Sequence, residues 1–115
     1  MSTRQDREFL QDILDAIQRV ETYTTGLTFE QFLEDFKTQD AILRNIQVLG
    51  EAIKNLSPSL RNSTSDIPWK EMAGMRDRII HRYFGIDFDI VWKVSKDELP
   101  ALYPRLNQIL PPEEK

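Results

Sequence analysis

Apolar residues recur at intervals of three and four positions along most of the chain, which is the spacing that places them on one side of a helix. The first stretch predicts a helix over residues 3–25, ended by Gly26. Its apolar positions are Phe9, Leu10, Ile13, Leu14, Ile17 and Val20. A second long helix is marked by Ile42, Ile46, Leu49, Ile53 and Leu56. It should stop at Ser57, because the residue before a proline avoids the helical conformation.

Shorter elements are predicted around these two helices. Thr28 and Gln31 have the spacing of a capping box, so a short helical segment should begin there. The polar run 60–65 has no periodicity and is predicted to be a loop. A third helix is predicted from Trp69 to Tyr83, because its apolar residues cluster on one side and Gly85 follows as a terminator.

The C-terminal part of the chain carries two further helix-start signals. Asp87 is suited to cap a helix, and Ser95 with Glu98 has the spacing of a capping box that should open the last helix. No alternating apolar and polar run of strand length is present. The sequence therefore predicts an all-α fold, an antiparallel bundle of four to five helices.

The composition narrows the class of protein. The chain has 115 residues, a length that suits one domain over residues 1–115. It contains no cysteine, so disulfides and thiol nucleophiles are excluded. Its net charge of −4 argues against a general nucleic-acid coat, and any site for a polyanion must be local. Neither a signal peptide nor a membrane span is indicated, so we expect a cytoplasmic protein without a membrane partner.

One segment, from Arg76 to His81, has residues suited to acid-base chemistry. His81 is the only histidine, and Asp77 lies four residues before it, so on a helix the carboxylate would orient the imidazole. Arg76 falls on the apolar side of the predicted helix, about 140° away from His81. A distortion near Gly74 or a two-fold dimer would bring Arg76 and His81 together. We favour a homodimer, because it supplies two imidazoles to one cleft.

Structural interpretations of these residues compete with the catalytic one. A lone histidine near a helix end can simply favour the helix dipole. Arg78 and Arg82 can belong to an ordinary solvated face, or they can join Arg61, Lys70 and Arg76 in concentrating positive potential around one cleft. One histidine and scattered carboxylates form no recognised metal site.

The spacing Arg76-x4-His81-x-Tyr83 resembles the signature of the HepT-like ribonuclease toxins of the HEPN superfamily, the toxins of type VII toxin–antitoxin pairs. In that signature an arginine and a polar residue precede a histidine by four to six positions, and Asp77 occupies the polar position. The resemblance extends to residues 41–52, 83–87 and 91–92. It therefore covers most of the chain.

The resemblance implies a helical bundle that dimerises and cuts RNA without a metal or another cofactor. His81 would act as general acid or base, and Arg76 would stabilise charge in the transition state. Asp77 would orient His81. We also expect Arg78 and Arg82 to bind phosphates of the substrate.

The resemblance also implies a protein partner, a minimal nucleotidyltransferase of the MntA type, which serves as antitoxin. In such pairs the partner attaches AMP to the tyrosine that Tyr83 matches, which would block the anion site. Two alternatives stay open: a non-catalytic HEPN nucleotide- or substrate-binding partner of a nucleotidyltransferase, and a purely structural dimerisation domain. Loss of turnover in a His81→Ala variant would favour the ribonuclease, and weakened binding alone would favour the binding partner. A mutation of Arg76 that changes only the oligomeric state would favour the dimerisation domain.

Overall fold

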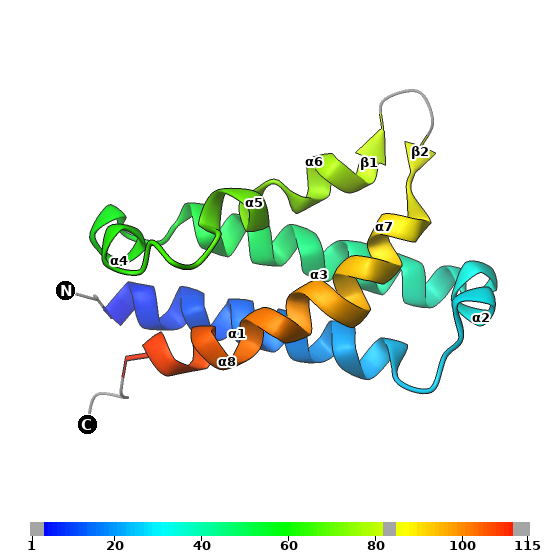
Figure 1. Cartoon of the computed structure of the whole chain (residues 1–115), viewed down its shortest axis with the longest axis horizontal. Coiled ribbons are helices and arrows are strands. Elements are labelled where there is room, and N and C mark those ends of the chain that lie inside the picture. Colours follow the sequence, from blue (N-terminus) through cyan, green and yellow to red (C-terminus); the bar gives the residue numbers. More distant parts are fainter. Residues whose placement is uncertain (1–3, 82–84, 112–115) are drawn as a thin grey trace.

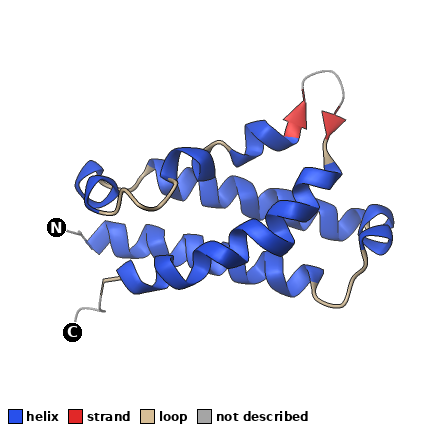
Figure 2. Ribbon diagram, in the orientation of Figure 1, coloured by secondary structure: helices blue, strands red, loops and turns tan. Residues whose placement is uncertain are grey.

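Helical rods lie alongside one another in the computed structural model, which describes residues 4–81 and 85–111 (Figure 1). Within these residues helix predominates, and the two strands are very short (Figure 2). The elements in chain order are α1 (Arg4–Thr24), α2 (Phe29–Glu34), α3 (Phe36–Lys54), α4 (Pro58–Ser63), α5 (Trp69–Ala73), α6 (Met75–Ile79), β1 (Ile80–His81), β2 (Gly85–Ile86), α7 (Phe88–Lys93), the π-helical turn η1 (Val94–Glu98) and α8 (Leu99–Ile109).

The antiparallel pair α1 and α3 forms the base of the bundle (Figure 1). The apolar stripe predicted for each helix is buried in one continuous core, which includes Leu10, Ile13, Leu14 and Ile17 of α1 and Ile42, Ile46, Leu49 and Ile53 of α3. Gly26 follows α1 with a φ of +80°, the left-handed conformation that suits glycine. The capping box of Thr28 and Gln31 opens α2 as predicted. Both long helices are therefore confirmed, although α3 ends at Lys54, three residues before the predicted stop at Ser57.

The predicted loop over residues 60–65 is wrong in its first part, because α4 occupies Pro58–Ser63. Ser57 caps this turn by accepting a hydrogen bond from the Leu60 amide. Asp6 of α1 in turn accepts hydrogen bonds from the amide and the hydroxyl of Ser57. This long-range support makes one helical turn stable where local periodicity gives no signal.

The single helix predicted from Trp69 to Tyr83 is also wrong. It is interrupted at Gly74, whose φ of −89° and ψ of 3° depart from the helical ψ, and α6 then ends at Ile79. The chain continues as strand β1, which pairs with β2 in an antiparallel hairpin with Ile80 opposite Ile86 and His81 opposite Gly85. Gly85 has a φ of +76°, so it serves the hairpin and not a helix end.

The last rod runs from α7 through η1 to α8 and crosses over α1 (Figure 1). Asp87 caps α7 as predicted, accepting from the Ile90 amide. The predicted capping box of Ser95 is wrong, because the Ser95 hydroxyl donates to the Val91 carbonyl inside a continuous helical rod. The π turn lies just before Pro100, which has no amide to give to the regular helical ladder.

The predicted all-α antiparallel bundle is confirmed, with the small β1–β2 hairpin as an addition. The third rod, α5 with α6, packs on α3, and the hairpin projects from its far end (Figure 1). Within residues 4–81 and 85–111, no helix combines the length and the apolar character that a membrane crossing requires.

Candidate functional site

The predicted site residues lie where α6 gives way to the hairpin. Arg76, Asp77 and Arg78 are exposed on α6, and His81 is exposed on β1. The predicted positions Arg82 and Tyr83 fall outside the described residues. His81 is therefore held on a short strand next to a helix end, and not within the helix that its spacing from Arg76 predicted.

The carboxylate beside His81 belongs to Asp87. The distance from His81 Nε2 to Asp87 Oδ2 is 3.7 Å, which is an ion-pair distance when the imidazole is protonated but too long for a hydrogen bond. The expectation that Asp77 orients His81 depended on both residues sharing one helix, and α6 ends at Ile79, two residues before the histidine. The structure removes that basis for the role of Asp77.

Asp87 is fixed by two further interactions. Its backbone amide donates to the Ile79 carbonyl at 2.8 Å, which closes the hairpin onto the end of α6. Its Oδ1 accepts from the Ile90 amide at 3.2 Å, which caps α7. With Oδ1 held by the Ile90 amide, Oδ2 is the carboxylate oxygen that faces His81. The sequence predicts Asp87 as a cap but gives no signal for its contact with His81, because the hairpin that creates this contact has no strand-like pattern.

Arg76 was expected on the apolar side of a helix, and this expectation is wrong: the interruption at Gly74 leaves its side chain exposed. It lines a hollow of about 300 Å³ between α6 and α3, together with Arg44, Gln47 and Ile80. Arg76 and Asp77 also line an adjoining hollow of about 230 Å³ that includes Lys54. The guanidinium is therefore open to an external anion along the groove between α3 and α6.

Arg78 is engaged within the protein. Its two terminal nitrogens donate to the two carboxylate oxygens of Glu98 at 2.9 and 2.8 Å, a bidentate pair that ties α6 to η1. The hydrogen bonds from Arg78 lower the pKa of Glu98, and the same hydrogen bonds raise the pKa of Arg78. A phosphate at Arg78 would have to share the guanidinium with Glu98, so its predicted role in substrate binding stays a prediction.

The arrangement suits proton transfer on an anionic substrate. An exposed imidazole next to an anchored carboxylate can take up or release a proton at the surface. The exposed guanidinium of Arg76, on the preceding helix α6, offers hydrogen bonds and charge to a phosphate. Among the side chains in the described part of the chain, no group of three or more His, Asp or Glu is placed to hold a metal ion.

Comparison with known proteins agrees with this type of site. The model of a protein family described as Ribonuclease HepT-like matches residues 13–109. The chain belongs to the HepT-like ribonuclease family. The resemblance noted from the Arg76–Tyr83 motif is thereby confirmed, and the matched region contains His81, Asp87 and Arg76.

Several relatives are similar over nearly their whole length. A probable ribonuclease HepT of Thermococcus cleftensis is 41% identical over 92% of this chain and 96% of its own. A candidate RNase of Methanocaldococcus jannaschii is 39% identical over 96% of this chain and 91% of its own. A candidate RNase of Caldanaerobacter subterraneus subsp. tengcongensis is 38% identical, over 94% and 96%. No solved structure gives a significant match.

Proposed function

We propose that this HepT-like protein is a metal-independent endoribonuclease, the toxin of a toxin–antitoxin pair that acts on RNA in the cytoplasm. The observation that carries the proposal is that the exposed His81 lies beside Asp87, whose carboxylate also caps α7. Arg76, on the helix α6 that precedes His81, is exposed as well. Membership in a family described as ribonucleases supports it. Sites with acid-base groups and a guanidinium are well suited to cleave phosphodiesters through the ribose hydroxyl.

The proposed reaction is an internal transfer. One His81 accepts the proton of the ribose 2′-hydroxyl, and O2′ attacks the adjacent phosphorus. The bond from phosphorus to the 5′-oxygen breaks, and that oxygen takes a proton from a second acid. The products are a 2′,3′-cyclic phosphate and a free 5′-hydroxyl. DNA lacks the attacking hydroxyl and should be spared.

A homodimer accounts for the second acid. The chain has one histidine, and two exposed hairpins facing each other across a two-fold axis would bring a base and an acid to one phosphate. Arg76 would hold the negative charge that builds on the phosphoryl oxygens. Asp87, and not Asp77, is the better candidate to orient His81, because of its 3.7 Å approach. Arg78 and Arg82 remain candidates for flanking phosphates.

The proposed regulation is covalent. A minimal nucleotidyltransferase of the MntA type would attach AMP to Tyr83, two positions after His81 in the sequence. The added phosphate would compete for the same guanidinium as the substrate and would silence cleavage. Co-expression with a nucleotidyltransferase of this type should add one or more AMP masses to the intact protein, and Tyr83→Phe should abolish the additions.

A test in cells distinguishes a toxic ribonuclease from a protein without ribonuclease activity. Wild type and His81→Ala are expressed alone from a tightly controlled promoter, and growth and total RNA integrity are followed. We expect wild type to arrest growth and degrade RNA, while His81→Ala does neither at equal protein level. Intact RNA and normal growth with wild type would contradict the proposal.

A second candidate function is that of a non-catalytic nucleotide- or substrate-binding partner of a nucleotidyltransferase. The net charge of −4 and the pairing of Arg78 with Glu98 favour it, because both reduce the positive potential available to a long polyanion. In that case His81→Ala would weaken nucleotide binding without removing any turnover.

A further inference from the structure

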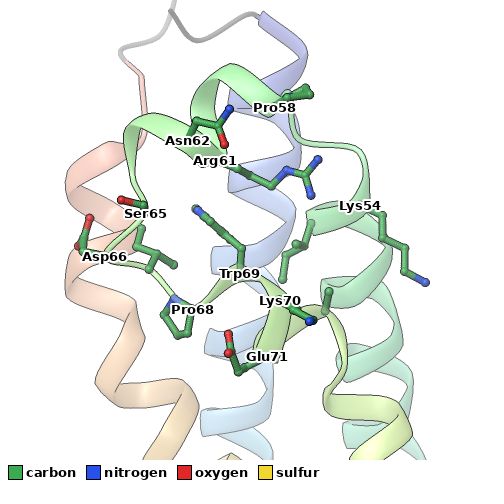
Figure 3. A pocket seen from close by; sticks show the side chains of 13 residues that line it. Lys54, Pro58, Arg61, Asn62, Ser65, Asp66, Pro68, Trp69, Lys70 and Glu71 are labelled. Carbon is green, nitrogen blue, oxygen red and sulfur yellow. The ribbon is translucent and has the colours of Figure 1, made fainter.

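A second cleft lies at the other end of the third rod, between α4, α5 and the end of α3. Its volume is about 830 Å³, and the predicted site residues are not among its lining residues. Figure 3 shows Arg61 and Lys70 on one side of the cleft, with Ser65 and Asp66 on the other. Lys54 belongs to the same basic side, but its side chain is directed outward (Figure 3).

Arg61 supplies a donor that the described part of the chain leaves without an acceptor. Its Nε is buried and makes no hydrogen bond with any described residue. A buried donor without a partner is costly, and a side-chain movement that brings Nε to an acceptor in the cleft would relieve that cost. Arg7 also has a buried Nε without a described partner, but Arg7 does not line this cleft.

The charges of the cleft favour an anion. The Asp66 carboxylate already accepts hydrogen bonds from Arg105 of α8, at 2.7 and 3.0 Å. Its negative charge is therefore balanced by Arg105 and not by Arg61. Of the remaining charged residues on its wall, Arg61, Lys54 and Lys70 outnumber Glu71. The chain as a whole is acidic, so this local excess of positive charge distinguishes the cleft from the average surface.

The wall of the cleft also has an apolar part, formed by Ile53, Pro68 and Trp69. The indole nitrogen of Trp69 donates to the Thr64 hydroxyl at 3.1 Å, so the polar edge of the ring is satisfied inside the protein. Trp69 is only 7% exposed, so its ring packs beneath the cleft and presents no open face to a base. The apolar part therefore shapes the cleft, and its basic side chains supply the contacts to a ligand.

The cleft adjoins the groove between α3 and α6 that Arg76 lines. Lys54 and Ala73 line both the cleft and the hollow that contains Arg76 and Asp77. Arg76 then lines the next hollow together with Ile80, the residue before His81. Three neighbouring depressions thus follow the seam of α3 with α5 and α6, from Arg61 to the start of the hairpin.

We propose that the Arg61 cleft binds the RNA strand away from the cut, with Arg61 and Lys70 on its phosphates. This inference rests on the proposed ribonuclease function and adds a substrate subsite to it. From Trp69 to Ile79, the ten helical residues of α5 and α6, at 1.5 Å each and with Gly74 between them, span roughly 16 Å. A stacked strand at 3.4 Å per nucleotide covers that length in about five nucleotides. The subsite therefore contributes only to RNAs that extend about this far from the cut.

Binding and cleavage are measured separately to test the subsite. Binding uses a fluorescent single-stranded RNA that is 2′-O-methylated throughout, so that it has no attacking hydroxyl. Arg61→Gln should weaken its binding about tenfold, as expected for a lost hydrogen bond to a charged group. Arg19→Gln, an equal change of charge on an exposed position of α1, should leave binding within about twofold. A dinucleotide analogue should bind Arg61→Gln and wild type equally.

Lys70→Gln is the second variant, because Lys70 is exposed and its replacement leaves the fold intact. It should weaken the long RNA more than Arg19→Gln does. Equal binding by Arg61→Gln, Lys70→Gln and Arg19→Gln would overturn the subsite, as would failure of wild type to bind the long RNA. Loss of a complex with the nucleotidyltransferase, with RNA binding unchanged, would assign the cleft to the protein partner instead. Binding of the methylated RNA with no cleavage of the same RNA in its unmodified form would overturn the ribonuclease function alone.

Discussion

The α1–α3 pair and the segment from α5 to α7 both contain apolar and charged residues, but they differ in how long one backbone conformation continues. Each long helix keeps its apolar period for about twenty residues and buries it in the common core. The site segment instead changes conformation every few residues, from α5 to α6, to a hairpin and to α7. Its buried residues, such as Met75 and Ile79, anchor it, and its polar residues remain exposed. Stability and chemistry are thus assigned to different parts of one small bundle.

The largest expected effect is on the stability of the bundle pair. Leu49 of α3 is fully buried, so Leu49→Ala should lower the free energy of unfolding by about 2–5 kcal/mol through lost contacts and a residual cavity. Leu33→Ala makes the same change at a leucine that is 40% exposed and should cost less than about 1 kcal/mol. Urea unfolding followed by circular dichroism measures both. Equal losses would contradict the division between core and surface.

An intermediate effect is expected at Asp87, where the two regions meet. Asp87→Ala removes the α7 cap and should cost about 1 kcal/mol, whereas Asp87→Asn keeps the cap and should cost only a few tenths. Both variants remove the negative charge beside His81, so both should lose RNA cleavage, by up to about 100-fold. Cleavage rates and melting temperatures of the two variants separate the roles.

Asp35 provides the matched control, since it caps α3 in the same manner and its carboxylate accepts hydrogen bonds from Thr38, outside the site. Asp35→Ala should reduce stability and keep the cleavage rate. Full activity in Asp87→Asn would show that the carboxylate has a structural role only and would return attention to Asp77.

The smallest effect is expected from the ion pair that ties α6 to η1. Because the pKa of Glu98 lies below its ordinary value of 4.5, the pair stabilises the fold above that pH, and this contribution disappears as the pH falls through the lowered pKa. Arg78→Gln should therefore destabilise at neutral pH and approach wild type in acid. The Arg78 side chain is 43% exposed, so screening limits the loss to less than about 1 kcal/mol. Thermal unfolding across pH tests the sign, and a constant difference at all pH values would contradict it.

The same contrast explains what could be predicted from the sequence. The helices α1 and α3 follow a long apolar period, so the pattern identified both, and each ends a few residues before its local signal, Gly26 for α1 and Ser57-Pro58 for α3. The site segment depends on contacts between distant residues, such as Asp6 with Ser57 and Asp87 with Ile79. Periodicity over residues 69–83 therefore predicted one helix where the interruption at Gly74 and the hairpin turn at Gly85 prevail.

The chemistry of the site was predictable in kind but not in geometry. The spacing of Arg76 and His81 indicated the family correctly, because family signatures are written in sequence positions. The partner of His81 was predicted as Asp77 from helical spacing, whereas the folded chain presents Asp87. The homodimer and the modification of Tyr83 remain predictions.

Cleavage of a defined RNA by the purified protein measures the proposed chemistry most directly. One strand is all RNA, and a second carries a single 2′-deoxyribose at the mapped cleavage position. Wild type should cut the first, leaving a 2′,3′-cyclic phosphate, and should not cut the second at that position. His81→Ala should fold normally, because His81 is exposed, and should cut the first strand about 100-fold more slowly or worse. Cleavage at the deoxyribose, or full activity in His81→Ala, would contradict an internal transfer that depends on His81.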